Sequence, residues 1–100
     1  MDVKLTEEAI KDKDSLSQDE WAKIKDKIDE ITNQLSHEGL KLISNPFLNH
    51  PIWQLTIEEN PANHRAFIDV RNSQIIIIAI WDFEFTHQGD DHWEELTNRV

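Results

Sequence analysis

An uninterrupted apolar run at residues 75–80 is the strongest hydrophobic feature of the chain, and it contains four consecutive isoleucines. β-Branched side chains fit a pleated strand better than a helix. An apolar run without alternation indicates a strand that is covered on both faces, and therefore interior in its sheet. We predict this central strand over residues 74–85. Regular alternation would place these side chains on one face: Ile75, Ile77, Ala79, Trp81, Phe83 and Phe85. Asp82 and Glu84 would make the end of the other face acidic.

Two amphipathic helices are predicted in the first half of the chain. Thr6 has the character of a helix N-cap, followed by two glutamates, and predicts a short helix over about residues 6–14. Ser17 and Glu20 form a capping-box pattern that opens a second helix, from about 18 to 37. The apolar stripe of this second helix follows spacings of three and four residues: Trp21, Ile24, Ile28, Ile31 and Leu35. The stripe would also suit a dimer seam, but the neighbouring apolar strand favours packing in the core.

Shorter patterns complete the predicted fold. Residues 2–5 alternate as a first strand, residues 40–51 form a connection, and two alternating strands precede the central one, around residues 53–58 and 65–71. These last strands form an antiparallel meander, and the first strand pairs at its edge. A short helix that begins near Asp91 closes the chain. We therefore expect one α+β domain over residues 1–100, with two helices on one face of a four-stranded, mainly antiparallel sheet.

Composition narrows the range of partners. The formal net charge is −10, and the only lysines and arginines beyond residue 42 are Arg65, Arg71 and Arg99. This balance argues against direct nucleic-acid binding, which normally requires clustered cations. The chain has no cysteine, which excludes disulfides and thiolate metal sites. Its first residues lack the pattern of a signal peptide. A soluble cytoplasmic protein is the expectation.

Four segments together resemble the RelE/ParE superfamily of bacterial toxin–antitoxin toxins, over residues 2–85. They are Val-Lys-Leu-Thr-Glu-Glu-Ala-Ile-Lys-Asp at 3–12, Ile-Trp-Gln-Leu-Thr-Ile at 52–57, Asn-His-Arg-Ala-Phe-Ile-Asp-Val at 63–70 and Ile-Ile-Ile-Ile-Ala-Ile-Trp-Asp at 75–82. The resemblance implies an antitoxin partner and a cellular target such as DNA gyrase or the ribosome. Only Arg65 aligns with a family arginine. Gln54 and Asp82 stand where the mRNA-cleaving members carry bases, and the chain has no tyrosine.

The candidate catalytic residues are Arg65, His64 and His87. Arg65 would stabilise a phosphate or transition-state charge, and a histidine would transfer protons. An equally good interpretation of Arg65 is a cross-strand ion pair with Asp82 or Glu84. For His64, a surface position just after a turn is the simpler interpretation.

A partner-binding surface is predicted at the end of the central strand, from an aromatic and acidic run: Trp81, Asp82, Phe83, Glu84 and Phe85. His87, Asp90, Asp91 and His92 have side chains of the kinds that bind zinc, but their spacing matches no known motif. We expect no metal and no cofactor.

These observations favour a toxin-like component of a type II toxin–antitoxin system, acting through protein–protein contact as ParE-like members do. A non-catalytic interaction module on the same scaffold is the first alternative. A ribosome-dependent mRNA endoribonuclease is the second, and the missing bases make it the least favoured.

Overall fold

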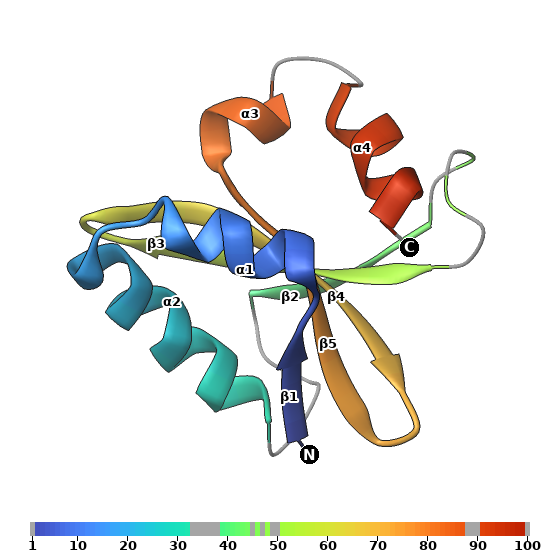
Figure 1. The fold of residues 1–100 in the computed structure, drawn as a ribbon, viewed down its shortest axis with the longest axis horizontal. Helices are drawn as coiled ribbons and strands as arrows, with labels where there is room; N and C mark the ends of the chain where they lie inside the picture. The colour runs from blue at the N-terminus through green and yellow to red at the C-terminus, as the bar shows by residue number, and fades with distance from the viewer. Residues whose placement is uncertain are drawn as a thin grey trace.

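The computed structural model describes residues 2–32, 39–44, 46, 48, 51–87 and 91–99. It confirms the α+β class (Figure 1). The elements, in chain order, are β1 (Asp2–Leu5), α1 (Glu7–Asp14), α2 (Gln18–Ile31), β2 (Leu40–Ile43), β3 (Ile52–Glu59), β4 (Ala62–Arg71), β5 (Gln74–Asp82), α3 (Phe83–His87) and α4 (Asp91–Arg99). None of the helices within these ranges is both long and apolar enough to cross a membrane.

The strands form one sheet in the order β1-β5-β4-β3-β2. β5 is interior, as its isoleucine run predicted, and β1 pairs with it in parallel at one edge. β3, β4 and β5 form the expected antiparallel meander. The prediction of four strands was wrong, because residues 40–43 form a fifth strand, β2, antiparallel to β3. Four residues are too few to show a clear alternation of apolar and polar positions in the sequence. Their extended conformation is stabilised by pairing with β3.

The two N-terminal helices begin where their caps predicted. The Thr6 side chain accepts a hydrogen bond from the Ala9 backbone N–H, and Ser17 with Glu20 makes both bonds of a capping box. α2 is shorter than predicted: it ends at Ile31, and the Thr32 backbone N–H bonds the Asp29 carbonyl instead of continuing the helical pattern. The predicted extension to residue 37 falls mostly on residues 33–38, outside the described residues.

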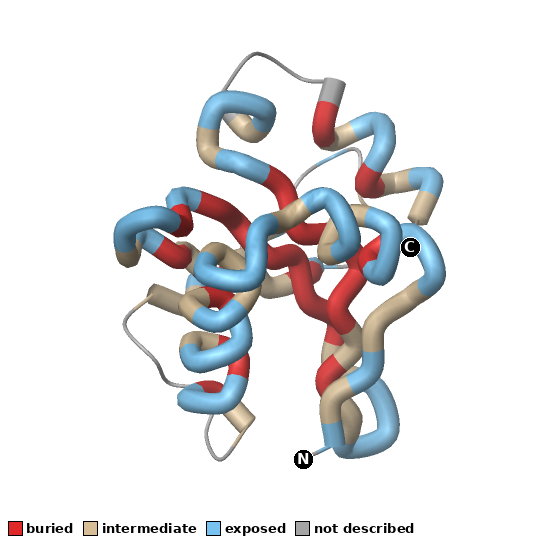
Figure 2. The backbone as a smooth tube through the Cα atoms, turned by 60° about the vertical axis from the view of Figure 1, so that its left-hand side comes forward, coloured by how far each residue is buried: buried red, intermediate tan, exposed pale blue. Residues whose placement is uncertain are grey.

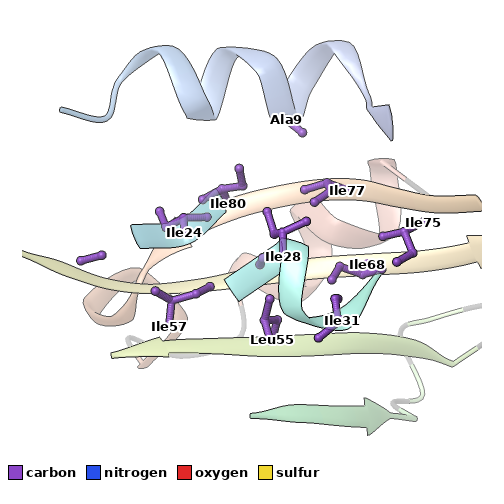
Figure 3. Packing of buried hydrophobic residues seen from close by; sticks show 12 residues of the cluster. Ala9, Ile24, Ile28, Ile31, Leu55, Ile57, Ile68, Ile75, Ile77 and Ile80 are labelled. Carbon is purple, nitrogen blue, oxygen red and sulfur yellow. The ribbon is translucent and has the colours of Figure 1, made fainter. Parts of the chain in front are cut away.

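The main core lies between the sheet and the helices α1 and α2 (Figure 3). Ile24, Ile28 and Ile31 of the predicted stripe are buried there, whereas Trp21 is only partly buried. Leu35 lies outside the described residues. Ala9 brings α1 close to β5, because its small side chain leaves room for the strand. The stripe is therefore a core-packing face rather than an exposed dimer seam.

A β-bulge in β5 changes which side chains share a face. Phe67 pairs with Ala79 and Ile68 with Ile77, so Ile78 is an extra residue on β5. Beyond the bulge the alternation is reversed. The predicted common face of residues 75, 77, 79 and 81 is therefore wrong: Ile75 and Ile77 belong to the main core, with Ile80, whereas Ala79 and Trp81 belong to a second cluster on the opposite face.

The second cluster is covered by α4. Its buried members are Ile52, Phe67, Ile78, Ala79, Trp81 and Leu96. Leu96 comes from α4, and a ring contact between Phe67 of β4 and Trp93 of α4 (6.2 Å between centroids) attaches the helix to the sheet. Within the sheet, Phe67 also contacts the Trp81 ring of β5 at 5.4 Å. Buried positions accordingly run through the middle strands and onto α4 (Figure 2). Both faces of β5 are thus covered.

The chain stops being a strand three residues earlier than predicted. β5 ends at Asp82, and residues 83–87 form the short helix α3. The Asp82 carboxylate accepts a hydrogen bond from the Phe85 backbone N–H at 2.8 Å. This bond turns the chain into α3 as a helix cap does. Phe83, Glu84 and Phe85 therefore do not alternate across a sheet.

We predict that replacing Ile28 with Ala lowers the free energy of unfolding by about 2–5 kcal/mol, through lost transfer energy and a residual cavity. Ile28 is 3 % exposed and packs in the main core. Urea denaturation is the measurement. The control is Asp26→Ala at an exposed position of the same helix, where a change within about 0.5 kcal/mol is expected for a surface substitution. Equal effects of the two substitutions would contradict the core position of the stripe.

Candidate functional site

A cavity of about 590 Å³ opens at the end of β5, where the connection from α1 to α2 meets the turn between β3 and β4 and the start of α3. Helix α1, the start of α2, the strand ends and α3 each contribute to its wall. The lining residues are Asp12, Ser15, Leu16, Glu20, Pro61, Asn63, His64, Ile80, Trp81, Asp82, Phe83, Glu84 and Phe85. Four of them are acids, and none is a lysine or arginine.

Glu20 and His64 face each other in this wall. One Glu20 carboxylate oxygen, Oε1, accepts a hydrogen bond from the Ser17 backbone N–H at 2.9 Å. That bond is the main reason why the pKa of Glu20 lies below its usual value of 4.5. The other oxygen, Oε2, lies 3.8 Å from His64 Nε2. Glu20 is therefore held ionised by its own helix cap.

His64 is 6 % exposed, in contrast to the surface position that its place after a turn indicates. Its Nδ1 accepts a hydrogen bond from the Asn63 backbone N–H at 3.1 Å. In the neutral ring the proton therefore sits on Nε2. The nearest described carboxylate oxygen to Nε2 is 3.8 Å away, which is beyond hydrogen-bond distance. The His64 side chain is thus buried in the cavity wall, and its Nε2–H lies on the side of the ring that faces Glu20.

Asp82, Glu84 and Phe85 form the mouth of the cavity. One Asp82 oxygen caps α3, and both acidic side chains are exposed. Phe85 is 39 % exposed and packs edge-on against Trp81, with 5.0 Å between ring centroids. Trp81 itself is 8 % exposed. Of the aromatic residues predicted to bind a partner, Phe85 is therefore the most accessible.

Arg65 lies on the opposite face of β4 from His64, because successive strand residues point to opposite faces. It is 7 % exposed. Its Nη2 donates to Glu58 Oε1 at 3.0 Å, its Nη1 donates to the His64 carbonyl at 2.9 Å, and its guanidinium lies 4.8 Å from the centre of the Phe83 ring. The alternative of an ion pair is thus realised, with Glu58 rather than with Asp82 or Glu84.

The rear wall of the cavity is held by an ion pair between α1 and α4. Arg99 Nη1 donates to Asp12 Oδ2 at 2.7 Å, and the same oxygen accepts the Ile80 backbone N–H at 3.1 Å. The two side chains are 11 % and 15 % exposed. Burial lowers the pKa of Arg99, but its hydrogen bond and attraction to Asp12 more than compensate, so that the pKa is raised. Asp12 is therefore occupied from within the chain.

The structure brings together the five residues predicted to bind a partner, and His64 with them, in one cavity wall. It does not bring His64 and Arg65 together. The side chain of His87 lies outside the described residues, so its predicted role stays a prediction. Sequence reasoning missed Asp12 and Arg99, which are 87 positions apart, and gave Glu20 only its capping role. Nothing in the local sequence signals a contact over such a distance.

Metal binding was not expected, and the described residues contain no group of three or more histidine, aspartate or glutamate side chains placed to hold an ion. The segment from His87 to His92 includes residues 88–90, which lie outside the described ranges. The expectation for that segment therefore stays a prediction.

The fold is similar to that of a chain in the crystal structure of the intact E. coli RelBE toxin–antitoxin complex. The TM-score is 0.64 with 17% sequence identity, and the match covers 81% of this chain and 94% of the other. No family model and no curated protein sequence matches the chain. The RelE-like fold expected from the sequence is thus confirmed. A sequence identity of 17% shows a common fold and nothing about a common function.

We predict that Arg99→Ala lowers the free energy of unfolding by on the order of 3 kcal/mol, because it leaves a largely buried Asp12 carboxylate without its cation. Chemical denaturation measures the loss. The control is Glu95→Ala, which removes the more exposed partner of the same arginine, 3.2 Å away, and should change stability by less than about 1 kcal/mol. A double-mutant cycle with Asp12→Ala that shows no coupling would contradict the structural role of the pair.

Proposed function

We propose that this chain is the toxin-like component of a bacterial type II toxin–antitoxin system, acts in the cytoplasm through protein–protein contact, and is neutralised by a cognate antitoxin. One domain over residues 1–100 would suffice for this. The fold supports the first part, because the similar chain comes from a toxin–antitoxin complex. The choice of protein contact over RNA cleavage comes from the charges.

The observation that carries this choice is the pairing of the arginines. Arg65 bonds Glu58, Arg71 bonds Asp69, and Arg99 bonds Asp12. All of the arginines are therefore engaged by carboxylates within the described part of the chain. An RNA-cleaving site needs cations that are free to hold phosphates and to stabilise a developing negative charge.

The cavity supports the same choice. Its carboxylates would repel a phosphate backbone, and the overall charge of −10 opposes the approach of any polyanion. His64 and Arg65, the groups that an acid–base mechanism would combine, lie on opposite faces of β4. A protein target such as DNA gyrase, one of the two that the family resemblance implies, fits an acidic and aromatic surface better than RNA does.

We predict that mRNA bound to ribosomes stays intact when it is incubated with the purified chain, as judged by primer extension. Arg65→Ala is the matched variant. If wild type cleaves and Arg65→Ala is slower by about 10²–10³, the loss expected for a transition-state donor, the protein-contact proposal is wrong and the chain is an endoribonuclease.

Induced expression in a bacterial host should arrest growth, and co-expression of the product of a neighbouring reading frame of antitoxin size should restore it. Colony counts after induction are the measurement. The same gene with an early stop codon controls for effects of the transcript. Normal growth of the strain that expresses the chain alone, equal to that of the co-expression strain and of the stop-codon control, would overturn the toxin role. It would favour the non-catalytic interaction module.

A further inference from the structure

The cavity at the end of β5 contains more negative charge than the chain itself neutralises. Asp12 is paired with Arg99, but Glu20, Asp82 and Glu84 have no lysine or arginine beside them in the cavity wall. One oxygen of Glu20 and one of Asp82 serve helix caps. The remaining carboxylate oxygens are available as hydrogen-bond acceptors at the mouth and in the wall.

A second feature points to a peptide rather than to a simple cation. His64 is more than nine-tenths buried in the cavity wall, and its Nε2–H lies on the side of the ring that faces Glu20, whose carboxylate is 3.8 Å away. A donor in this position would be satisfied by a carbonyl oxygen entering the cavity. A metal ion would not serve, because it would need the lone pair that the Nε2 proton occupies. A peptide carbonyl beside a positively charged side chain meets both requirements.

The aromatic rings of the cavity wall favour a guanidinium over an ammonium group as the bound cation. The chain already places its own guanidinium groups over ring faces: Arg65 over Phe83 at 4.8 Å and Arg99 over Trp81 at 5.1 Å. Phe85, at the mouth, is 39 % exposed. A planar guanidinium can stack on such a ring while it forms paired hydrogen bonds to carboxylates, which a compact ammonium does less well.

We propose that this cavity binds an arginine of a protein partner. Its guanidinium lies between Glu20, Asp82 and Glu84 beside the Phe85 ring, and an adjacent peptide carbonyl accepts the His64 Nε2–H. The proposal rests on the protein-contact part of the proposed function, and it adds the chemical class of the partner segment. The volume of about 590 Å³ is sufficient for one arginine with its flanking peptide groups.

The test uses N-acetyl-arginine N-methylamide, which carries the guanidinium and both peptide carbonyls. The citrulline compound is its uncharged isostere. Titration at low salt, followed by ¹H–¹⁵N chemical shifts, should map the arginine compound to residues 63–64 and 80–85, with a Kd at least about tenfold smaller than that of the citrulline compound. Added salt should weaken binding, because the mouth is open to solvent.

The variant Glu20→Gln, Asp82→Asn, Glu84→Gln removes three charges and keeps both helix caps, since an amide oxygen still accepts the cap bonds. It should abolish the preference for arginine over citrulline. The control Glu8→Gln, Asp26→Asn, Glu94→Gln removes three exposed acids elsewhere and should keep the preference. If the triple cavity variant does not fold, Glu84→Gln alone, at an exposed position, should weaken arginine binding several-fold.

Equal binding of arginine and citrulline, shifts that map elsewhere, or equal losses in both triple variants would overturn the proposal. The growth assay is independent of this titration. Arginine binding without growth arrest would leave the cavity assignment standing and remove the toxin role. Growth arrest without arginine binding would support the toxin role and overturn the assignment of the cavity as an arginine site.

Discussion

The central strand β5 is longer than the strand that pairs with its outer edge, and much of the structure follows from this mismatch. β1 ends at Leu5, opposite Ile77, while β5 runs on to Asp82. Buried backbone groups need hydrogen-bond partners whether or not a strand supplies them. Here Thr6, Asp12 and Arg99 supply them, through bonds to the Ile77 and Ile78 carbonyls and the Ile80 N–H. Thr6, the N-cap of α1, and side chains of α1 and α4 thus complete the edge of the sheet.

This edge also explains why both ends of the chain shape one site. Asp12 fixes α1 against β5, and Arg99 fixes α4 against the same segment. The cavity lies where β5 leaves this supported stretch and turns into α3. Its rear wall is made rigid by an internally satisfied ion pair, while its mouth keeps carboxylates that no lysine or arginine of the wall neutralises. An acid that stabilises the fold, Asp12, therefore lies beside acids that no lysine or arginine of the cavity wall neutralises.

Local patterns predicted the elements that depend on local physics. The caps at Thr6 and Ser17, the stripe from Ile24 to Ile31 and the isoleucine run of β5 all appear in the fold as expected. The faces of β5 were predicted wrongly beyond Ile77, because alternation assumes a regular strand and a single extra residue reverses it. The end of β5 was also predicted wrongly, because Asp82 caps α3 and the chain turns into a helix there. The alternation of apolar and polar residues continues to Phe85 and gives no sign of this turn. Residues 81–85 of the candidate site could be singled out as a stretch, but the cavity that they line could not be predicted, since its other walls come from distant segments.

The pairing of β5 has a consequence for how the chain folds as it is synthesised. β1 and β5 pair across some seventy intervening residues, and the loop that their contact closes is entropically expensive. Until β5 has left the ribosome, α1 and α2 have no complete sheet on which to bury their isoleucines. The edge of β5 is completed later still, when Arg99 arrives. Folding of this domain therefore waits until residues 74–99 are available, and until then the emerging chain exposes apolar helix faces, a stage at which association with other proteins competes with folding.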